Sequence, residues 1–300
     1  MKGIFIILLV AISKLVFAQS KPITSIPFTV EKNCIYLYAR VNKTDSIKFL
    51  FDTGADGSVI NKQSVNKLNL KLDGKSLNQG SNGLNEVESS SENEITIGSI
   101  TKKNVLLTII PYETNSFDGV MGTNLMQGYI IEIDYNKQLL HFHSKDDKNI
   151  DYKNYTKFKL YTKGYPTIIK SSMIVNGKKY KGFFGLDTGA DDPLTLASPF
   201  ARKNNFINKA PNIGSASFQG SDGSINELQI ILVPEIEFAG KHLYRIPTAL
   251  SNAKEGIDAT ENLAGFFGNA FLNKFNIILD YDNGNIYFKL NKNLYKEYYE

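Results

Sequence analysis

The sequence predicts a mostly β protein made of two similar lobes, and three observations lead to that prediction. The four residues Asp-Thr-Gly-Ala occur twice, at residues 52–55 and 187–190. Short β-branched and aromatic runs, separated by Gly, Asn and Asp, fill both halves of the chain, as is typical of strands joined by turns. A length of 300 residues suits two domains or one bilobal unit.

The four-residue motif belongs to a longer internal repeat. A short apolar run precedes each copy, and further landmarks keep the same order around both copies. The repeat has the size of a domain rather than of a solenoid unit, which indicates a duplicated lobe. The matching segments are residues 41–42 and 175–176, 79–83 and 219–223, 95–98 and 236–240, and 119–125 and 265–271.

The strands are predicted from local composition. Residues 46–51 and 179–186 are expected to be strands that lead into the two motif turns. An Asn-Gly pair at residues 283–284, between apolar segments, is a strong hairpin signal. The matching region of the first half is residues 129–142.

Signals for helix are few. Residues 198–205 begin with Ser-Pro, which predicts a helix over this range. Short helices are expected after Gly122 and Gly268. The polar stretch 144–154 has no apolar periodicity, so we expect it to link the two halves.

The first residues are typical of a secretory signal peptide. Lys2 precedes an apolar stretch, residues 4–12, and Ala18 ends the segment. Lys14 interrupts the segment, which is too short for a spanning helix, and no later segment approaches that length. We therefore expect export to the periplasm, the cell envelope or the medium, with no membrane span in the mature chain. The predicted parts are the signal peptide 1–18, an N-terminal lobe 19–148 and a C-terminal lobe 149–300.

Composition argues against several function classes. The formal charge of +4 comes from basic and acidic residues spread along the chain, which gives no argument for nucleic-acid binding. Cys34 is the only cysteine, so no intramolecular disulfide forms, and its apolar neighbours favour a buried thiol over a nucleophile. His141 and His143 alternate on a predicted strand, but two ligands without a third favour packing over metal binding. No metal or cofactor is predicted.

The chemistry is expected at the two motif aspartates, Asp52 and Asp187. A single aspartate at such a turn is more simply explained as a turn cap, whereas two such turns can face each other. Two carboxylates within hydrogen-bonding distance cannot both ionise easily, so they share a proton and hold a water between them. One then acts as base and the other as acid, which is what amide hydrolysis requires.

The repeated apolar-DTGA turn with its later apolar-apolar-Gly segment resembles the clan of pepsin-like and retroviral-type aspartic proteases. Residues 186–192 are especially similar to the retroviral enzymes, which carry one motif per subunit of a dimer, whereas pepsin-like enzymes carry two in one chain. The resemblance spans about residues 26–288. It implies the bilobal acid-protease fold, with β-barrel-like lobes related by a pseudo-twofold axis, and Asp52 and Asp187 as catalytic residues.

Four more motif residues are expected to support the dyad. The hydroxyls of Thr53 and Thr188 are predicted to reach across the pseudo-twofold axis and bond the backbone of the opposite loop. Gly54 and Gly189 lack a Cβ, so backbone amides can approach the carboxylates and donate to them.

The acids after the motif are weaker candidates for substrate binding. The resemblance implies that Asp56 and Asp191 contact the substrate backbone, as in retroviral proteases, where the first acid also pairs with an Arg after the later Gly. Thr123 and Asn269 stand at those positions here, so that Arg is absent. For Asp191, and for Asp192 beside it, a role in stabilising the turn remains open.

Two Gly-rich segments fall where the family has flap hairpins that close over substrate. They suggest two flaps of the retroviral type, with plain hairpin turns as the alternative. Neither tip carries the Tyr of pepsin-like flaps. The candidate substrate-binding glycines are Gly80, Gly83, Gly220 and Gly223.

The leading functional prediction is an exported aspartic endopeptidase that acts on peptides or unfolded protein segments as a monomer. One alternative is a non-catalytic peptide- or protein-binding module on the same fold. Another is pairing of each half with the same half of a second molecule.

Ala55 and Ala190 stand where pepsin-like enzymes usually carry Ser or Thr, so the carboxylates lack a donor that stabilises their charge. We therefore predict an acid limb of the pH–rate profile at higher pH than a Ser/Thr site would give. Ala55→Ser and Ala190→Thr should move that limb to lower pH. An unmoved profile in both variants would refute this idea.

Overall fold

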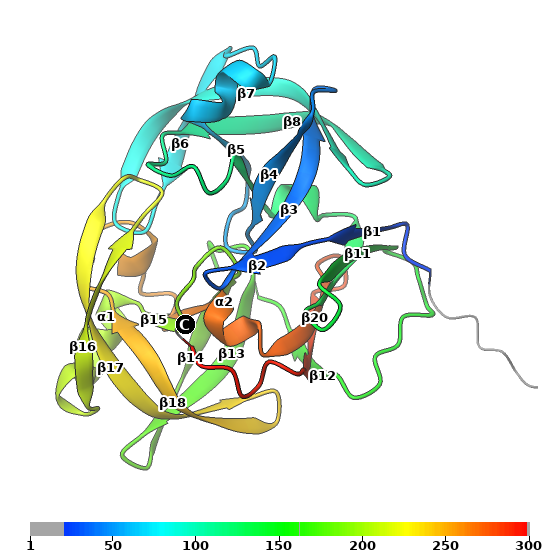
Figure 1. The fold of residues 1–300 in the computed structure, drawn as a ribbon. Helices are drawn as coiled ribbons and strands as arrows, with labels where there is room; N and C mark the ends of the chain where they lie inside the picture. The colour runs from blue at the N-terminus through cyan, green and yellow to red at the C-terminus, as the bar shows by residue number, and fades with distance from the viewer. Residues whose placement is uncertain (1–20, 162, 299–300) are drawn as a thin grey trace, which may run out of the picture.

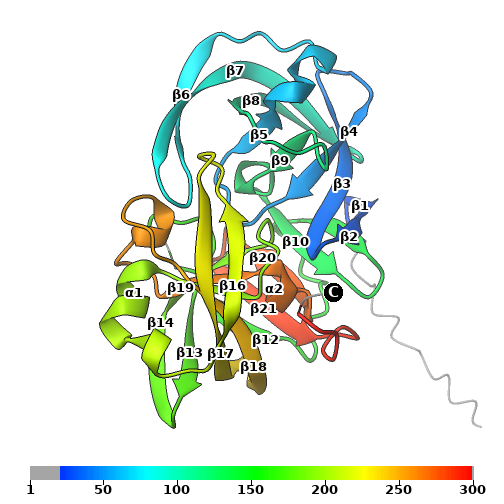
Figure 2. The same cartoon turned by 60° about the vertical axis from the view of Figure 1, so that its left-hand side comes forward.

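The computed structural model describes residues 21–161 and 163–298. The predicted signal peptide lies outside the described residues. Most of the regular secondary structure is strand, arranged in three sheets (Figures 1 and 2). Within the described part of the chain, no helix is long and apolar enough to cross a membrane.

The N-terminal lobe is built on an eight-stranded sheet that curls around an apolar core. Its order in space is β2 (Thr29–Glu31), β3 (Cys34–Val41), β4 (Ser46–Phe51), β9 (Gly119–Met121), β5 (Ser58–Asn61), β8 (Ile100–Ile110), β7 (Leu84–Ile97) and β6 (Gly74–Gln79).

The C-terminal lobe repeats, on seven strands, the order that runs from β3 to β6 in the N-terminal lobe. In each set of seven, the first strand also pairs with the sixth. The duplication seen in the sequence is therefore a duplication of topology, and the two barrel-like lobes are related by a pseudo-twofold axis. The strands in order are β13 (Ile168–Val175), β14 (Lys178–Asp187), β19 (Gly265–Gly268), β15 (Leu194–Leu196), β18 (Lys241–Leu250), β17 (Ile225–Phe238) and β16 (Asn212–Gln219).

A third, six-stranded sheet joins the two halves. The hairpin expected around residues 129–142 pairs directly with the one that turns at residues 281–284, because Ile130 lies opposite Asp280. The sequence predicted both hairpins but not that they share a sheet. Its order is β1 (Thr24–Pro27), β11 (Leu139–Ser144), β10 (Tyr129–Asp134), β20 (Phe275–Asp280), β21 (Asn285–Leu290) and β12 (Thr156–Lys159).

The two α-helices lie where the sequence predicted helix. The first, α1 (Ser198–Asn204), has Pro199 in its first turn and ends at Asn205 in the left-handed conformation (φ 52°). A single 3₁₀ turn, Thr123–Leu125, follows Gly122, and α2 (Asn269–Leu272) follows Gly268. The remaining 3₁₀ turns are Lys62–Lys67, Phe206–Asn208 and Ile257–Ala259.

Residues 145–155, between β11 and β12, contain no strand. Ile150 in this connection is buried against Ile130 and Ile278 of the shared sheet. The connection is thus pinned by an apolar contact, and the proposed lobe boundary after residue 148 falls inside it.

Gly122 gives the fold a sharp stability test. A Cβ at this position would lie 2.1 Å from the carbonyl oxygen of Gly57, whose backbone cannot withdraw easily. Gly122→Ala should lower the free energy of unfolding by about 1–3 kcal/mol. Gly57→Ala is the matched control, since its Cβ meets no atom within 4 Å, and should change stability by less than about 0.5 kcal/mol. Urea denaturation measures both, and equal losses would contradict the steric argument.

Candidate active site

The two motif turns meet between the lobes, at the ends of β4 and β14. Asp52 Oδ1 accepts hydrogen bonds from the amides of Gly54 (2.6 Å) and Ala55 (3.1 Å). Asp187 Oδ1 accepts the equivalent bonds from Gly189 (2.9 Å) and Ala190 (3.1 Å). Each turn therefore fixes one oxygen of its own carboxylate with two backbone donors.

The threonines cross from one lobe to the other. Thr53 Oγ1 donates to the carbonyl oxygen of Leu186 at 2.8 Å, and Thr188 Oγ1 donates to that of Phe51 at 2.8 Å. Each hydroxyl also accepts the amide of the opposite threonine, at 3.1 and 3.2 Å. Both side chains are buried. Four bonds in a twofold arrangement thus hold the two turns together, as the sequence predicted.

The motif glycines lie against the opposite carboxyl group. A Cβ on Gly54 would lie 2.7 Å from Asp187 Cγ, and one on Gly189 would lie 2.6 Å from Asp52 Cγ. From the sequence, these glycines were expected to act within their own turns. Their further role is to let the two aspartates approach each other.

Proximity disfavours ionisation of both carboxyl groups at once. Burial, the charge of Asp187 and a hydrogen bond between the two side chains raise the pKa of Asp52 well above its usual value, although the amides of Gly54 and Ala55 work in the opposite direction. The pair therefore holds one proton over a range of pH where free aspartates hold none. A pair of carboxyl groups that shares one proton can provide a base and an acid together.

Comparisons with known proteins agree with this geometry. Residues 37–125 match the family model of the aspartyl proteases. A search of curated proteins finds no match. The crystal structure of aspartic proteinase from Irpex lacteus has a similar fold, with a TM-score of 0.59 at 12% sequence identity, over 91% of this chain and 98% of that one. Residues 37–125 thus resemble the aspartyl proteases in sequence, and nearly the whole chain shares its fold with an aspartic proteinase.

Both Gly-rich segments form hairpin tips, and the two tips touch (Figure 2). Asp222 Oδ2 accepts the amide of Asn82 at 2.8 Å, and Asn82 Nδ2 donates to Ser224 Oγ at 3.0 Å. Gly80 leaves room for this contact, since a Cβ there would lie 2.6 Å from the Asp222 amide nitrogen. Gly83 and Gly220 border the same side chain, and Gly223 has the positive φ (82°) of a tight turn.

The first tip also contacts the C-terminal lobe. The amides of Ile257 and Asp258 donate to the carbonyl oxygens of Gly80 and Ser81, at 3.1 and 3.0 Å. Burial and the charge of Asp187 raise the pKa of Asp258 to about 7. Asp258 could not be predicted from the sequence, because it reaches this position through a long loop.

Sequence reasoning also missed Tyr165, which lies in the loop before β13. Its hydroxyl donates to Asp187 Oδ2 at 3.1 Å. Its ring packs on Phe266 and over Gly185, two residues before Asp187. A glycine inside that strand was the available signal, because it marks the close approach of another group.

The acids after the motif lie in different surroundings. Asp56 and Asp191 are exposed. Asp192 is buried, and its Oδ2 accepts a bond from Thr195 Oγ1 at 2.7 Å. Burial raises its pKa to about 7. A turn-stabilising role therefore fits Asp192, while Asp56 and Asp191 remain predictions for substrate binding.

Cys34 and the histidines lie in ordinary structural surroundings. Burial and the nearby carboxylates raise the pKa of the Cys34 thiol, which disfavours the thiolate. His141 contacts Ser25, and His143 contacts Glu132 on the neighbouring strand. Among residues 21–161 and 163–298, no cluster of three or more metal-binding side chains is found.

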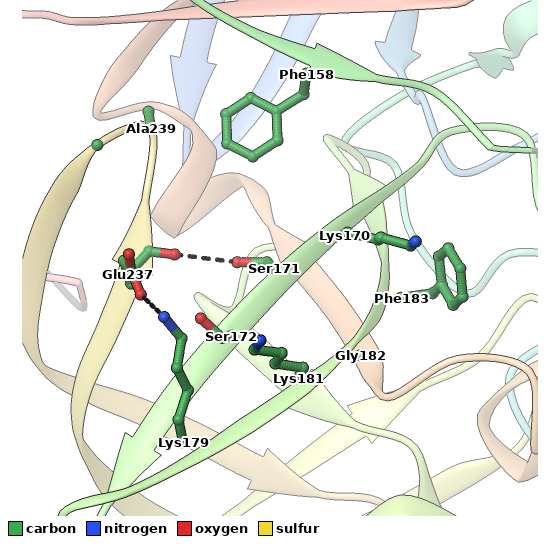
Figure 3. A pocket seen from close by; sticks show the side chains of 11 residues that line it. Phe158, Lys170, Ser171, Ser172, Lys179, Lys181, Gly182, Phe183, Glu237 and Ala239 are labelled. Carbon is green, nitrogen blue, oxygen red and sulfur yellow. Dashed lines mark hydrogen bonds and ion pairs between the residues drawn. The ribbon is translucent and has the colours of Figure 1, made fainter.

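A separate hollow lies on the C-terminal lobe (Figure 3). Lys179 there forms an ion pair with Glu237, whose carbonyl oxygen accepts a bond from Ser171. None of the predicted site residues lines it. This hollow is therefore no part of the candidate active site.

The contact between the tips is expected to depend on Asp222. Although burial opposes ionisation, hydrogen bonds from Ser224, Asn82 and Gly83 lower the pKa of Asp222. Its contribution is then present above the usual pKa of aspartate, about 3.9, and is lost as pH falls through the lower value in the folded state. Asp222→Ala should reduce hydrogen-exchange protection in both hairpins on the order of ten-fold at neutral pH.

Ser221→Ala is the matched control, because Ser221 contributes its carbonyl oxygen to the contact, as acceptor for Asn78. It should leave protection unchanged. Equal protection in wild type and Asp222→Ala would show that the tips do not depend on this carboxylate.

Proposed function

We propose that this protein is an aspartic endopeptidase that hydrolyses peptide bonds with a water activated between Asp52 and Asp187. The observation that carries the proposal is the pair of carboxyl groups that share a hydrogen bond, each fixed by two amides of its own turn. The match of residues 37–125 to the aspartyl protease family supports a protease-like function. Fold likeness alone would not, because folds host many functions.

In the proposed mechanism, the ionised aspartate takes a proton from the water, whose oxygen attacks the carbonyl carbon of the substrate. The protonated aspartate hydrogen-bonds the carbonyl oxygen as negative charge develops there. The tetrahedral intermediate collapses when the leaving nitrogen receives a proton and the C–N bond breaks. The dyad ends with one proton, as it began, and no covalent intermediate forms.

The proposed substrates are peptides or unfolded protein segments. The touching hairpin tips lie over the chain's own C-terminal lobe through Ile257 and Asp258, so a substrate would enter by parting them. An extended segment passes between the parted tips more readily than a folded domain does. Activity as a monomer is proposed as well, since the threonine bonds join two halves of one chain. Export, as residues 1–18 predict, is part of the same proposal.

Asparagine substitutions at the dyad provide the direct test. Asp52→Asn and Asp187→Asn keep an oxygen that accepts the turn amides, so both should fold, while proton transfer is lost. Cleavage of unfolded casein across a pH series should fall by about 10²–10⁴-fold in each variant. Asp146→Asn, at an exposed residue between the lobes, is the control and should keep wild-type activity.

Binding of a statine-type transition-state mimic separates the alternatives. Casein cleavage that the mimic inhibits supports the enzyme. No cleavage at any pH, with peptide binding retained, would instead favour a non-catalytic binding module. Full activity in either asparagine variant would refute the dyad, and activity only in a dimer would refute the monomer.

A further inference from the structure

We infer that the Tyr165 hydroxyl makes the two aspartates unequal, so that Asp187 is the ionised member of the dyad and Asp52 holds the proton. The inference rests on the proposed function in assigning Asp187 the role of base and Asp52 that of acid. Tyr165 acts through Asp187 and is therefore a positioning residue.

The contact is direct and confined. The Tyr165 hydroxyl donates to Oδ2 of Asp187 at 3.1 Å, while the Oδ1 atom of that carboxylate is occupied by the amides of Gly189 and Ala190. Asp187 thus accepts three hydrogen bonds from groups outside the dyad. A carboxylate that accepts two or three donors is stabilised in its charged form.

The hydroxyl is held in place by its surroundings. The Tyr165 ring lies 5.0 Å from the ring of Phe266, and a Cβ on Gly185 would come within 2.7 Å of it. Thr167 lies two residues after Tyr165. Its backbone carbonyl oxygen accepts a hydrogen bond from the amide of Leu186 at 2.8 Å, and its hydroxyl donates to the carbonyl oxygen of Thr53 at 2.9 Å. The loop is therefore anchored to both motif turns.

Tyr165 is also confined to the role of donor. Burial and the charges of Asp187 and Asp52 raise the pKa of Tyr165 well above its usual value, so the phenol keeps its proton. The phenol therefore donates its proton in a hydrogen bond, for which an ionised Asp187 is the acceptor.

The first lobe lacks this contact. Leu50 takes the place of Gly185 two residues before the aspartate, and its side chain is buried there. Within the described residues, Asp52 accepts bonds from the amides of Gly54 and Ala55 and shares one with Asp187, and no hydroxyl donates to it. Both motif turns carry alanine where pepsin-like enzymes usually carry a Ser or Thr hydroxyl. Tyr165 thus supplies a hydroxyl donor to one of the two aspartates only.

The other titratable residues near the dyad are the same in wild type and in Tyr165→Phe. Asp192 and Asp258 lie on the second lobe, and both have pKa values raised to about 7, chiefly by burial. The groups whose charges act on the pair or feel it are Cys34, Tyr112, Asp192, Asp258 and Tyr281.

Tyr165→Phe tests the inference, since it keeps the ring and removes only the donor. The acid limb of the pH profile of kcat/KM should move up by about one pH unit, because a hydrogen bond to a charged group is worth about 1.5–3 kcal/mol. A merely structural tyrosine would lower activity at all pH values and leave the limb in place. Adding Ala190→Ser to Tyr165→Phe should return the limb toward lower pH. Tyr161→Phe, four residues away and packed on Phe183, is the control and should leave the limb unmoved.

A second measurement does not need turnover and so separates this inference from the proposed function. Wild-type cleavage of casein tests the function, whereas the melting temperature of wild type and Tyr165→Phe across pH tests the inference. A donor to an ionised carboxylate stabilises the fold above the acid limb and contributes nothing once the dyad is fully protonated. The loss of melting temperature in Tyr165→Phe should therefore shrink as pH falls. A loss that is constant with pH, or an unmoved acid limb, overturns the inference.

Discussion

The crossing threonines are the interaction on which the rest of the site depends. Thr53 and Thr188 each bond a carbonyl oxygen of the other lobe, in a place from which water is excluded. A buried donor or acceptor left without a partner costs about 1–3 kcal/mol, so the four bonds resist separation of the turns as a set. Because each threonine follows its aspartate directly, fixing the threonines fixes the distance between the carboxyl groups. The two motif glycines then allow an approach that any larger residue would prevent.

Two further connections constrain the lobes at a distance from the threonines. The six-stranded sheet draws strands from both halves beneath the site, where β10 pairs with β20. On the other side, the hairpin tips meet through Asn82 and Asp222. The sheet is backbone-paired and packed against phenylalanines, whereas the tip contact rests on a few side-chain bonds near solvent. Side-chain contacts near solvent open at lower free energy than a backbone-paired sheet. We therefore expect the tips to be more mobile than the sheet beneath the carboxyl groups.

Much of this arrangement could be predicted from sequence because it is local or repeated. The motif turns, the helix after Ser198, the hairpin at Asn283 and the Gly-rich tips each depend on short signals that lie within a few residues. The shared sheet, Tyr165 and Asp258 could not be predicted in the same way. Each depends on contacts between segments distant in sequence, and a lone Tyr or Asp in a loop carries no pattern. Only Gly185, a glycine within a strand, hinted that another group approaches the second aspartate.

The differences between the two halves explain more about function than their likeness does. With identical halves, the two aspartates would have identical surroundings, and nothing would decide which one holds the proton. Where the first half has Leu50 the second has Gly185, which admits the Tyr165 ring and gives one aspartate a third outside donor. Where the first tip has Asn82 the second has Asp222, and the carboxylate of one meets the amide of the other. Two aspartates facing each other there would repel. Duplication therefore supplies the paired carboxyl groups, and the later differences supply the asymmetry that we propose separates base from acid.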